Sequence, residues 1–379
     1  MTQNYHTVIL GGGPSGISAA ILLQKAGRAT CVIDRAVFPR DKTCAGLVTL
    51  KTYNRIRHLM AGRSEAELEP LFCDWTDKVS VYDRDRRLCA TRAGIGYRLV
   101  RRRHFDNELV RYYRELGGAL LEGQRAYDID FERRTVTLHG NDSSLLSYEY
   151  LIAADGAKSA VRRQLGLGLK QMGFSLETHI PKKDCTFPVD EVRITFGVID
   201  GGYAWIFPSG DDMCIGVINT YEPGCTDYRG ILSAYLASLG LDASRYEMRG
   251  AYIPYGDVTD TRSLPRNVLM VGDAGGFVDP LVGEGLYLAL TSGTFAAECI
   301  IAGRPEAFRP RMRPHVRSIC QGRVLRNRFY TPRVLDYFYR HIQGREKFFR
   351  FFCDHHISTD LYPTTWLGLI RLLWGYKRR

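Results

Sequence analysis

The stretch TVILGGGPSG, residues 7–16, decides the fold. Its first four residues are β-formers, and a run of glycines follows them directly. Residues 14–26 have a helical composition that starts with proline and is stopped by Gly27. Residues 29–33 are β-rich again, so the sequence predicts a strand, a tight turn, a helix and a second strand, which together form a βαβ unit.

The glycines of this turn suit the binding of a pyrophosphate. Gly11, Gly13 and Gly16 permit a tight turn, and free N–H groups at the helix N-terminus attract negative charge. Asp34 follows the second predicted strand, near the spacing of a ribose-binding carboxylate. A tight turn with a surface aspartate is the alternative, but the complete context favours a dinucleotide site. The pattern does not distinguish NAD from FAD.

Two later segments also begin where a buried strand is expected to end. These are ADGAKSAVR, residues 154–162, and VGDAGGFVDP, residues 271–280. Ligands bind beyond the carboxyl ends of strands in an open parallel sheet, so Asp155 and Asp273 are expected to converge on the crevice of the first glycines. A further helix opens at residues 283–285, and its N-terminus can face a phosphate or a reduced flavin anion.

The fold class expected is α/β, with a Rossmann-like parallel sheet and a second domain. We expect a discontinuous dinucleotide-binding domain of residues 1–75, 98–168 and 250–304, an antiparallel β domain of residues 76–97 and 169–249, and a helical C-terminal region, 305–379. The expected elements include a hairpin over 78–90, helices over 102–116 and 283–302, and strands over 150–154, 191–198, 203–207, 213–219 and 267–271.

Composition and charge exclude several classes of protein. The chain has 379 residues and 45% hydrophobic residues, which is enough for two or three globular domains. Its ten cysteines lack the Cys-x-x-Cys spacing of a zinc site, and the neighbours His355 and His356 diverge on a helix or strand, so no metal and mostly reduced thiols are expected. The polar start lacks a signal peptide, which favours a cytoplasmic location.

The three strand-end segments resemble the para-hydroxybenzoate hydroxylase-type FAD superfamily, and in detail its geranylgeranyl reductase branch. The resemblance covers roughly residues 5–300. It implies that Asp34 contacts the adenosine ribose, that Arg102 lies near FAD and that Asp273 holds the ribityl chain. A solvated charge at a helix start is the alternative for Arg102. The residues expected to bind FAD are Gly11, Gly13, Pro14, Ser15, Gly16, Asp34, Arg35, Cys44, Ala45, Gly46, Arg102, Asp155, Gly156, Gly272, Asp273, Gly283, Gly285 and Leu286.

Two further motifs resemble those of the reductase branch. Residues 38–46, FPRDKTCAG, are similar to its Pro-Arg-x-Lys-x-Cys-Gly-Gly, with Ala45 in place of a glycine. Residues 203–208, YAWIFP, are similar to its Tyr-x-Trp-x-Phe-Pro. Cys44 lines the flavin face, forms a redox-sensitive pair or is a small buried hydrophobe. The strand alternation puts three aromatic rings on one face, as a substrate wall or as ordinary core; the expected substrate residues are Tyr203, Trp205, Phe207 and Pro208.

The C-terminal region carries the net charge of +11. From Arg304 to Arg379 the chain has 17 Lys and Arg against 5 Asp and Glu. Apolar residues recur at helical spacing over 366–374, in a stretch too short to span a bilayer. This helix either lies at the surface of a membrane, at the inner face of the cell membrane, or packs on the core. The arginine-rich C-terminal fifth is expected to attract anionic lipid headgroups or the phosphate of a polyprenyl substrate, and its aromatic residues are expected to contact acyl or isoprenoid chains. No nucleic-acid-binding motif accompanies the charge.

The resemblance implies an enzyme that reduces carbon–carbon double bonds of an isoprenoid chain attached to a lipid, quinone or diphosphate. Cys44 and Tyr203 are the candidate catalytic residues. Alternatives are an FAD-dependent monooxygenase or halogenase, and a prenyl-binding protein of the Rab GDP-dissociation inhibitor type, which the acids at the strand ends disfavour. Since there is one glycine fingerprint, the electron donor, either NAD(P)H or a protein such as ferredoxin, stays open.

Overall fold

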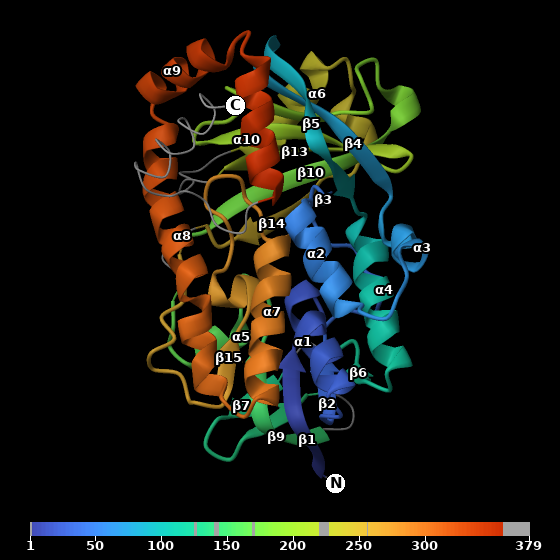
Figure 1. The fold of residues 1–379 in the computed structure, drawn as a ribbon, viewed down its shortest axis with the longest axis vertical. Coiled ribbons are helices and arrows are strands. Elements are labelled where there is room, and N and C mark those ends of the chain that lie inside the picture. Colours follow the sequence, from blue (N-terminus) through green and yellow to red (C-terminus); the bar gives the residue numbers. More distant parts are fainter. Residues whose placement is uncertain are drawn as a thin grey trace.

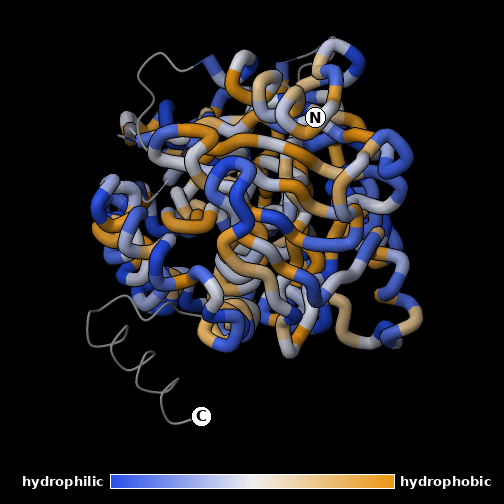
Figure 2. Tube along the Cα trace, turned by 90° about the horizontal axis from the view of Figure 1, so that it is seen from above, coloured by the Kyte–Doolittle hydropathy of each residue, from blue (hydrophilic) through white to orange (hydrophobic). Residues whose placement is uncertain are grey.

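The computed structural model describes residues 2–124, 127–139, 144–168, 171–219, 227–255 and 257–358. Two sheets follow one another along the long axis of the molecule, with helices packed on both (Figure 1). The hydrophobic residues follow the strands and the buried helices, while hydrophilic segments lie mostly at the periphery (Figure 2). The predicted α/β class is confirmed.

The first sheet contains the expected parallel strands. Its order is β6-β2-β1-β9-β8-β7, and β15 also pairs with β9. The pairs β1–β2, β1–β9, β2–β6 and β9–β15 are parallel, while β7, β8 and β9 form antiparallel pairs. The strands are β1 (Thr2–Leu10), β2 (Thr30–Ile33), β6 (Ala119–Leu121), β7 (Tyr127–Asp130), β8 (Thr135–Leu138), β9 (Ser144–Ala153) and β15 (Val268–Met270).

Four helices pack together beside this sheet. They are α1 (Pro14–Lys25), α2 (Leu50–Leu59), α4 (Arg102–Glu115) and α7 (Leu286–Ile301). Their apolar residues share one core, in which Ile9 of β1, Ile17 of α1 and Phe105 of α4 are fully buried. The short helices α3 (Glu65–Leu68) and α5 (Ala160–Gln164) and the 3-10 turn η4 (Gly272–Gly275) complete this part.

The second sheet has the order β14-β10-β13-β12-β11-β4-β5-β3. Its pairs are antiparallel as expected, except that β11 pairs with β4 in parallel. The strands are β3 (Leu47–Val48), β4 (Asp74–Asp83), β5 (Arg86–Leu99), β10 (Gly173–Pro181), β11 (Val192–Phe196), β12 (Gly202–Ser209), β13 (Asp212–Asn219) and β14 (Arg249–Ile253). Helix α6 (Tyr228–Ser238) packs on β10 and β13.

Three C-terminal helices connect the two sheets. Helix α8 (Phe308–Phe329) runs along one side of the molecule, α9 (Pro332–Ile342) turns at the end of the second sheet and α10 (Glu346–Ser358) returns beside β5 (Figure 1). The predicted apolar stretch over 366–374 lies outside the described residues. Within the described part of the chain, no helix is long and apolar enough to cross a bilayer.

The sequence-based boundaries are wrong at two informative places. Strand β1 begins at Thr2 and not at residue 7, because its polar first residues pair with the start of β9 outside the buried core. Helix α7 begins at Leu286 and not at residue 283. Gly283 has φ +72°, which an α-helix does not allow, and its N–H bonds to the Asp279 carbonyl in a turn.

Candidate active site

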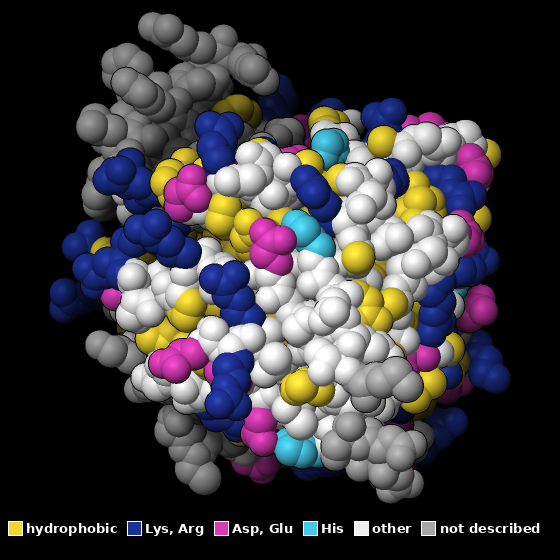
Figure 3. Space-filling model, turned by 90° about the horizontal axis from the view of Figure 1, so that it is seen from below, with side chains coloured by type: hydrophobic (Ala, Val, Ile, Leu, Met, Phe, Trp, Pro, Cys, Tyr) yellow, Lys and Arg dark blue, Asp and Glu magenta, His cyan; other side chains and the backbone are white. Residues whose placement is uncertain are grey.

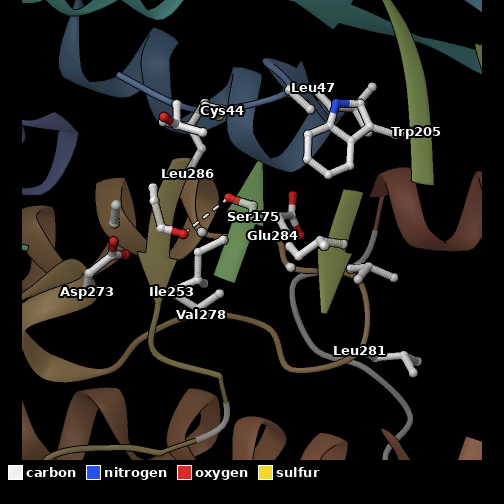
Figure 4. Close-up of a pocket in the computed structure, with 18 of the residues that line it drawn as sticks. Cys44, Leu47, Ser175, Trp205, Ile253, Asp273, Val278, Leu281, Glu284 and Leu286 are labelled. Atoms are coloured by element: carbon white, nitrogen blue, oxygen red, sulfur yellow. Dashed lines mark hydrogen bonds between the residues drawn. The ribbon is translucent and has the colours of Figure 1, made fainter. Parts of the chain in front are cut away.

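One large cavity joins the two sheets and the C-terminal helices. Its volume is about 1900 Å³, and its lining begins at the glycine turn of residues 11–15. It continues past Cys44 to the aromatic residues of β12 and ends at residues of α8, α9 and α10. Figure 4 shows its middle, with Cys44 and Trp205 on one side and Asp273 and Val278 opposite them.

The glycine turn requires glycine for steric reasons. Gly11 has φ +106°, and a Cβ atom there would lie 2.3 Å from the Ala154 carbonyl oxygen. A Cβ atom on Gly16 would lie 1.9 Å from the Gly11 carbonyl oxygen, so Gly16 allows the turn to close on α1. Gly13 is the N-cap and Pro14 the first residue of α1, whose N-terminus therefore faces the cavity.

Asp34 lies where β2 ends, beside the glycine turn. Its carboxylate accepts hydrogen bonds from the Gly12 N–H at 2.7 Å and the Ala36 N–H at 2.8 Å. The residue is 8% exposed and lines the cavity with Arg35. Asp34 therefore holds the turn in place and presents a carboxylate at the position that the sequence predicts for a ribose contact.

Asp155 follows β9, and only one of its two carboxylate oxygens accepts hydrogen bonds from the described part of the chain. Its Oδ2 atom accepts hydrogen bonds from the Tyr127 hydroxyl at 3.2 Å and from the Ala160 N–H at 2.6 Å. Its Oδ1 atom is buried without a hydrogen-bond partner among the described residues. A buried acceptor without a partner is costly, so a ligand hydroxyl in the cavity would satisfy it.

Asp273 follows β15 and lies in η4, opposite the N-terminus of α7. The strand continues directly into the site, since the Val271 N–H bonds to the Ala153 carbonyl. Asp273 Oδ1 would lie 3.8 Å from a Cβ atom on Gly285, and both residues line the cavity with Gly283 and Leu286. The three predicted strand-end acids thus line one cavity.

Arg102 is not a solvated charge. Its guanidinium makes two hydrogen bonds to Asp106, at 2.7 and 2.8 Å, and the Asp106 side chain is fully buried. Arg40 lies 3.3 Å from the same carboxylate. Although burial lowers the pKa of Arg102, the Asp106 charge and hydrogen bonds raise it above its usual range. Arg102 is therefore a fixed positive charge in the cavity wall, next to Cys44.

The segment around Cys44 is held by a residue that the sequence did not suggest. The Cys44 N–H donates to Glu177 Oε1 at 2.8 Å, and the Glu177 side chain is buried on β10. Burial raises the pKa of Glu177 to about 7. Its Oε2 atom has no hydrogen-bond partner among the described residues, and Cys214 is a neighbour of the carboxyl group. Glu177 can therefore hold a proton in the cavity wall at neutral pH.

The substitution at Ala45 does not disturb this segment. Gly46 has φ +82°, and a Cβ atom on it would lie 2.2 Å from the Val100 carbonyl oxygen. Ala45 is not among the residues with positive φ. Glycine is therefore required at position 46, where the chain has it, and alanine fits at position 45.

The aromatic residues of β12 form a wall of the cavity. Tyr203, Trp205 and Phe207 all line it, as their alternation predicts. The Tyr203 hydroxyl donates to the Val282 carbonyl at 2.7 Å, and burial raises its pKa well above the usual range. Trp205 Nε1 lies 3.5 Å from the Cys214 sulfur. Of the expected site residues, Gly16, Gly272 and Pro208 lie outside the lining and serve packing.

Several lining residues were missed at the sequence level. Tyr127 and Glu177 lie in segments without a recognisable motif. The one signal for Glu177 in the sequence is that it is a single acidic residue in a run of β-forming residues, where burial is expected. Glu284 lies between two recognised glycines, where it pairs with Lys51 at 2.6 Å. The aromatic residues of the C-terminal region were expected to contact acyl or isoprenoid chains, but nothing in their spacing indicates that those of α9 and α10 line the same cavity as the glycine turn.

One group of side chains has the atom types of a metal site. Within the described part of the chain, Glu177, His179 and Cys214 place ligand atoms within 4.8 Å of one another. However, Arg102 and Lys42 are close enough to Glu177 to affect its titration, and Arg101 and Arg249 do the same at His179. A dication would meet these positive charges, so the group does not support a metal site.

The fold and the cavity define a dinucleotide-binding protein with a second domain closing its site. Residues 4–193 match the family described as FAD binding domain. The chain belongs to this family, and it is an FAD-dependent oxidoreductase. The cavity fits the cofactor, since the glycine turn leaves room for a phosphate and Asp155 Oδ1 offers an unsatisfied acceptor.

The chain is similar over most of its length to several curated proteins. It is 27% identical to menaquinone reductase of Mycobacterium tuberculosis, over 77% of this chain and 76% of that protein. It is 24% identical to the chloroplastic geranylgeranyl diphosphate reductase of Nicotiana tabacum, over 94% of this chain and 79% of the relative. The resemblance to the flavoprotein superfamily with its geranylgeranyl reductases is thereby confirmed.

Solved structures show the same fold. A geranylgeranyl bacteriochlorophyll reductase-like protein of Thermoplasma acidophilum has a TM-score of 0.75 at 16% identity, covering 100% of this chain and 98% of its own. A flavin-dependent brominase has a TM-score of 0.74 at 17% identity, with 99% of both chains covered. At this identity the likeness concerns the fold alone, so it does not separate reductase from halogenase.

Proposed function

We propose that this enzyme reduces carbon–carbon double bonds in the isoprenoid chain of a lipid, quinone or diphosphate. The observation that carries the proposal is the continuity of the cavity. It leads from the glycine turn and Asp273 to an aromatic wall that includes Tyr203 and Trp205. A flexible apolar chain fits such a wall, and the curated relatives named as menaquinone and geranylgeranyl diphosphate reductases support this class of substrate.

The residues of this chain would hold both reactants and keep water out. Asp34, Asp155, Asp273 and the N-termini of α1 and α7 would hold FAD, which supplies a hydride when reduced. An unactivated alkene accepts hydride poorly, so it must be held in a dry site while a proton arrives. The rings of β12 and of the C-terminal helices provide that apolar enclosure.

Cys44 and Tyr203 are the proposed proton donors, and their surroundings differ. The Tyr203 hydroxyl is engaged by the Val282 carbonyl, and its raised pKa makes it a weaker acid. Cys44 lines the cavity beside the protonatable Glu177. Turnover of Cys44→Ser tests this proposal: full activity of the variant would remove Cys44 as the donor.

Anaerobic turnover distinguishes the reductase from its rivals. The yellow enzyme is photoreduced without oxygen and mixed with geranylgeranyl diphosphate or with menaquinone. Flavin reoxidation together with loss of an alkene, followed by mass spectrometry, supports the reductase. Product formation only when oxygen is admitted supports a monooxygenase or halogenase, and a colourless protein that does not take up FAD supports a prenyl-binding role.

The electron donor and a membrane contact are further parts of the proposal. The donor would be NAD(P)H or a protein such as ferredoxin, and flavin reduction rates with each decide between them. Peripheral binding to anionic membrane would bring the enzyme to a lipid substrate. Flotation with anionic liposomes tests it, and equal flotation of the full chain and of a truncation at residue 363 would discard the role of the tail.

A further inference from the structure

The two ends of the cavity differ in charge. The end near the glycine turn is lined by side chains of both signs: carboxylates such as Asp34, Asp155 and Asp273 alternate with bases such as Arg35 and Arg102. The lining residues of the C-terminal region, from α8, α9, α10 and the loop before α10, include no Asp or Glu. They include three arginines, Arg328, Arg333 and Arg345, and also His341. The cavity therefore carries both signs of charge where the nucleotide is expected, and it is basic at the other end.

The three arginines are available for a ligand. All three are exposed residues that line the cavity. None of them forms an ion pair with a described carboxylate, whereas Arg340 and Arg350 on the same helices pair with Asp336 and Asp354. A guanidinium binds phosphate oxygens with two parallel hydrogen bonds, which makes arginine the preferred partner of phosphate groups.

Aromatic rings connect the two ends. The ring of Trp205 lies 6.4 Å from that of Tyr203, which lies 6.4 Å from Phe196. Phe196 in turn lies 5.8 Å from Phe329 and 5.9 Å from Phe338, the rings of α8 and α9 next to the arginines. At the inner end, the Trp205 indole contacts the Cys214 sulfur, and Cys214 neighbours Glu177, which holds Cys44.

We propose that Arg328, Arg333 and Arg345 form a subsite for the phosphate or diphosphate head of a prenyl substrate, whose chain follows the aromatic rings toward Cys44. The inference rests on the proposed function and narrows it to substrates with an anionic head. A neutral quinone head leaves three arginines at this end without a partner. An anionic head, in contrast, matches the charge of the cavity end and the apolar path behind it.

Binding measurements on the FAD-loaded full chain test the subsite without relying on turnover. The probes are geranylgeranyl diphosphate and the uncharged geranylgeraniol, which have the same chain. Geranylgeranyl diphosphate is expected to bind about tenfold or more tightly, and this advantage should shrink as salt rises from about 50 to about 500 mM. Equal affinity of the two probes would overturn the subsite.

Matched variants locate the effect. Arg328→Gln, Arg333→Gln and Arg345→Gln together should weaken diphosphate binding about tenfold or more while changing geranylgeraniol binding less than about threefold. The control combines Arg309→Gln, Arg313→Gln and Arg317→Gln, which remove the same charge from exposed positions of α8 outside the cavity lining. A control that loses as much affinity would refute a local site, since the effect would then come from net charge.

Two further experiments identify the source of the phosphate group and test the proposed reaction independently of the subsite. A phospholipid with two geranylgeranyl chains replaces the soluble diphosphate in one arm. Arginine-dependent binding of either probe supports the subsite and identifies its source, whereas binding of neither overturns it. In the other arm the photoreduced enzyme is mixed with geranylgeraniol and, separately, with geranylgeranyl diphosphate. If the two compounds bind but keep all their double bonds, the proposed reduction fails while the subsite stands.

Discussion

Gly11 shows how a single hydrogen in place of a side chain lets the turn approach the end of β9 closely. Its φ of +106° and the 2.3 Å between a Cβ atom and the Ala154 carbonyl oxygen both forbid alanine. Gly11→Ala is expected to lose most of its FAD and to be destabilised by about 1–3 kcal/mol or more. The ratio of flavin to protein absorbance and the melting temperature measure the two effects.

The control for this variant is Gly168→Ala. Gly168 has an ordinary φ, and a Cβ atom there meets nothing within 4 Å. Its flavin content and melting temperature should match those of the unaltered protein. If Gly11→Ala behaved in the same way, the close approach of the turn to β9 would not be required.

Glu177 predicts a pH dependence of stability with a definite sign. Its pKa rises from 4.5 to about 7 on folding, mainly through burial, so the folded chain binds more protons than the unfolded one in this range. The contribution of Glu177 to stability is therefore fully present below about pH 4.5, is lost as the pH rises to about 7 and stays constant above. Each pKa unit corresponds to about 1.4 kcal/mol.

Glu177→Gln removes this titration and keeps an oxygen for the Cys44 N–H. The melting temperature of the variant minus that of the unaltered protein should therefore increase between about pH 5 and about pH 8. Exposed Glu132 provides the control, since Glu132→Gln should leave the pH profile unchanged. A constant difference for Glu177→Gln across this range would contradict a raised pKa.

At the scale of elements, β12 is tied to the loop before α7 by one hydrogen bond. The Tyr203 hydroxyl donates to the Val282 carbonyl at 2.7 Å, and both residues line the cavity. Tyr203→Phe leaves that carbonyl without its donor and should cost about 1–2 kcal/mol. In Tyr228→Phe the deleted hydroxyl has no described partner, so a smaller loss is expected there. Equal melting temperatures for the two variants would show that the hydrogen bond from Tyr203 to Val282 does not stabilise the fold.

The sequence predicted the elements that carry local signals. Adjacent residues specify several features that the structure confirms: the turn at Gly11, the end of the helix near Gly27, and the strand ends before Asp155 and Asp273. The parallel pairing of β11 with β4 could not be predicted in this way, because it joins residues more than a hundred positions apart in the sequence. Glu177 was missed for the same reason: its role depends on Cys44, which reaches it only through the folded chain.

At the scale of the whole molecule, the charge is distributed unevenly along the chain. The excess of Lys and Arg belongs to the region that follows α7, and the C-terminal helices bring part of it to the far end of the cavity. Lys and Arg side chains lie along both sides of the face in Figure 3. Electrostatic steering by the arginines of the C-terminal region acts over about 10 Å at 0.1 M salt. An anionic substrate would therefore be drawn to the arginine-lined end.

Hydrogen exchange should resolve the two ends of the cavity as separate ligand sites. FAD added to the apoprotein is expected to slow exchange at the N-termini of α1 and α7, where the glycine turns lie. Geranylgeranyl diphosphate added to the FAD-loaded protein should slow exchange in β12, at the end of α8, in α9 and around the start of α10, which supply the aromatic wall and the arginines. Protection by the prenyl probe confined to the glycine turns would contradict this division, because it would place both ligands at the nucleotide end.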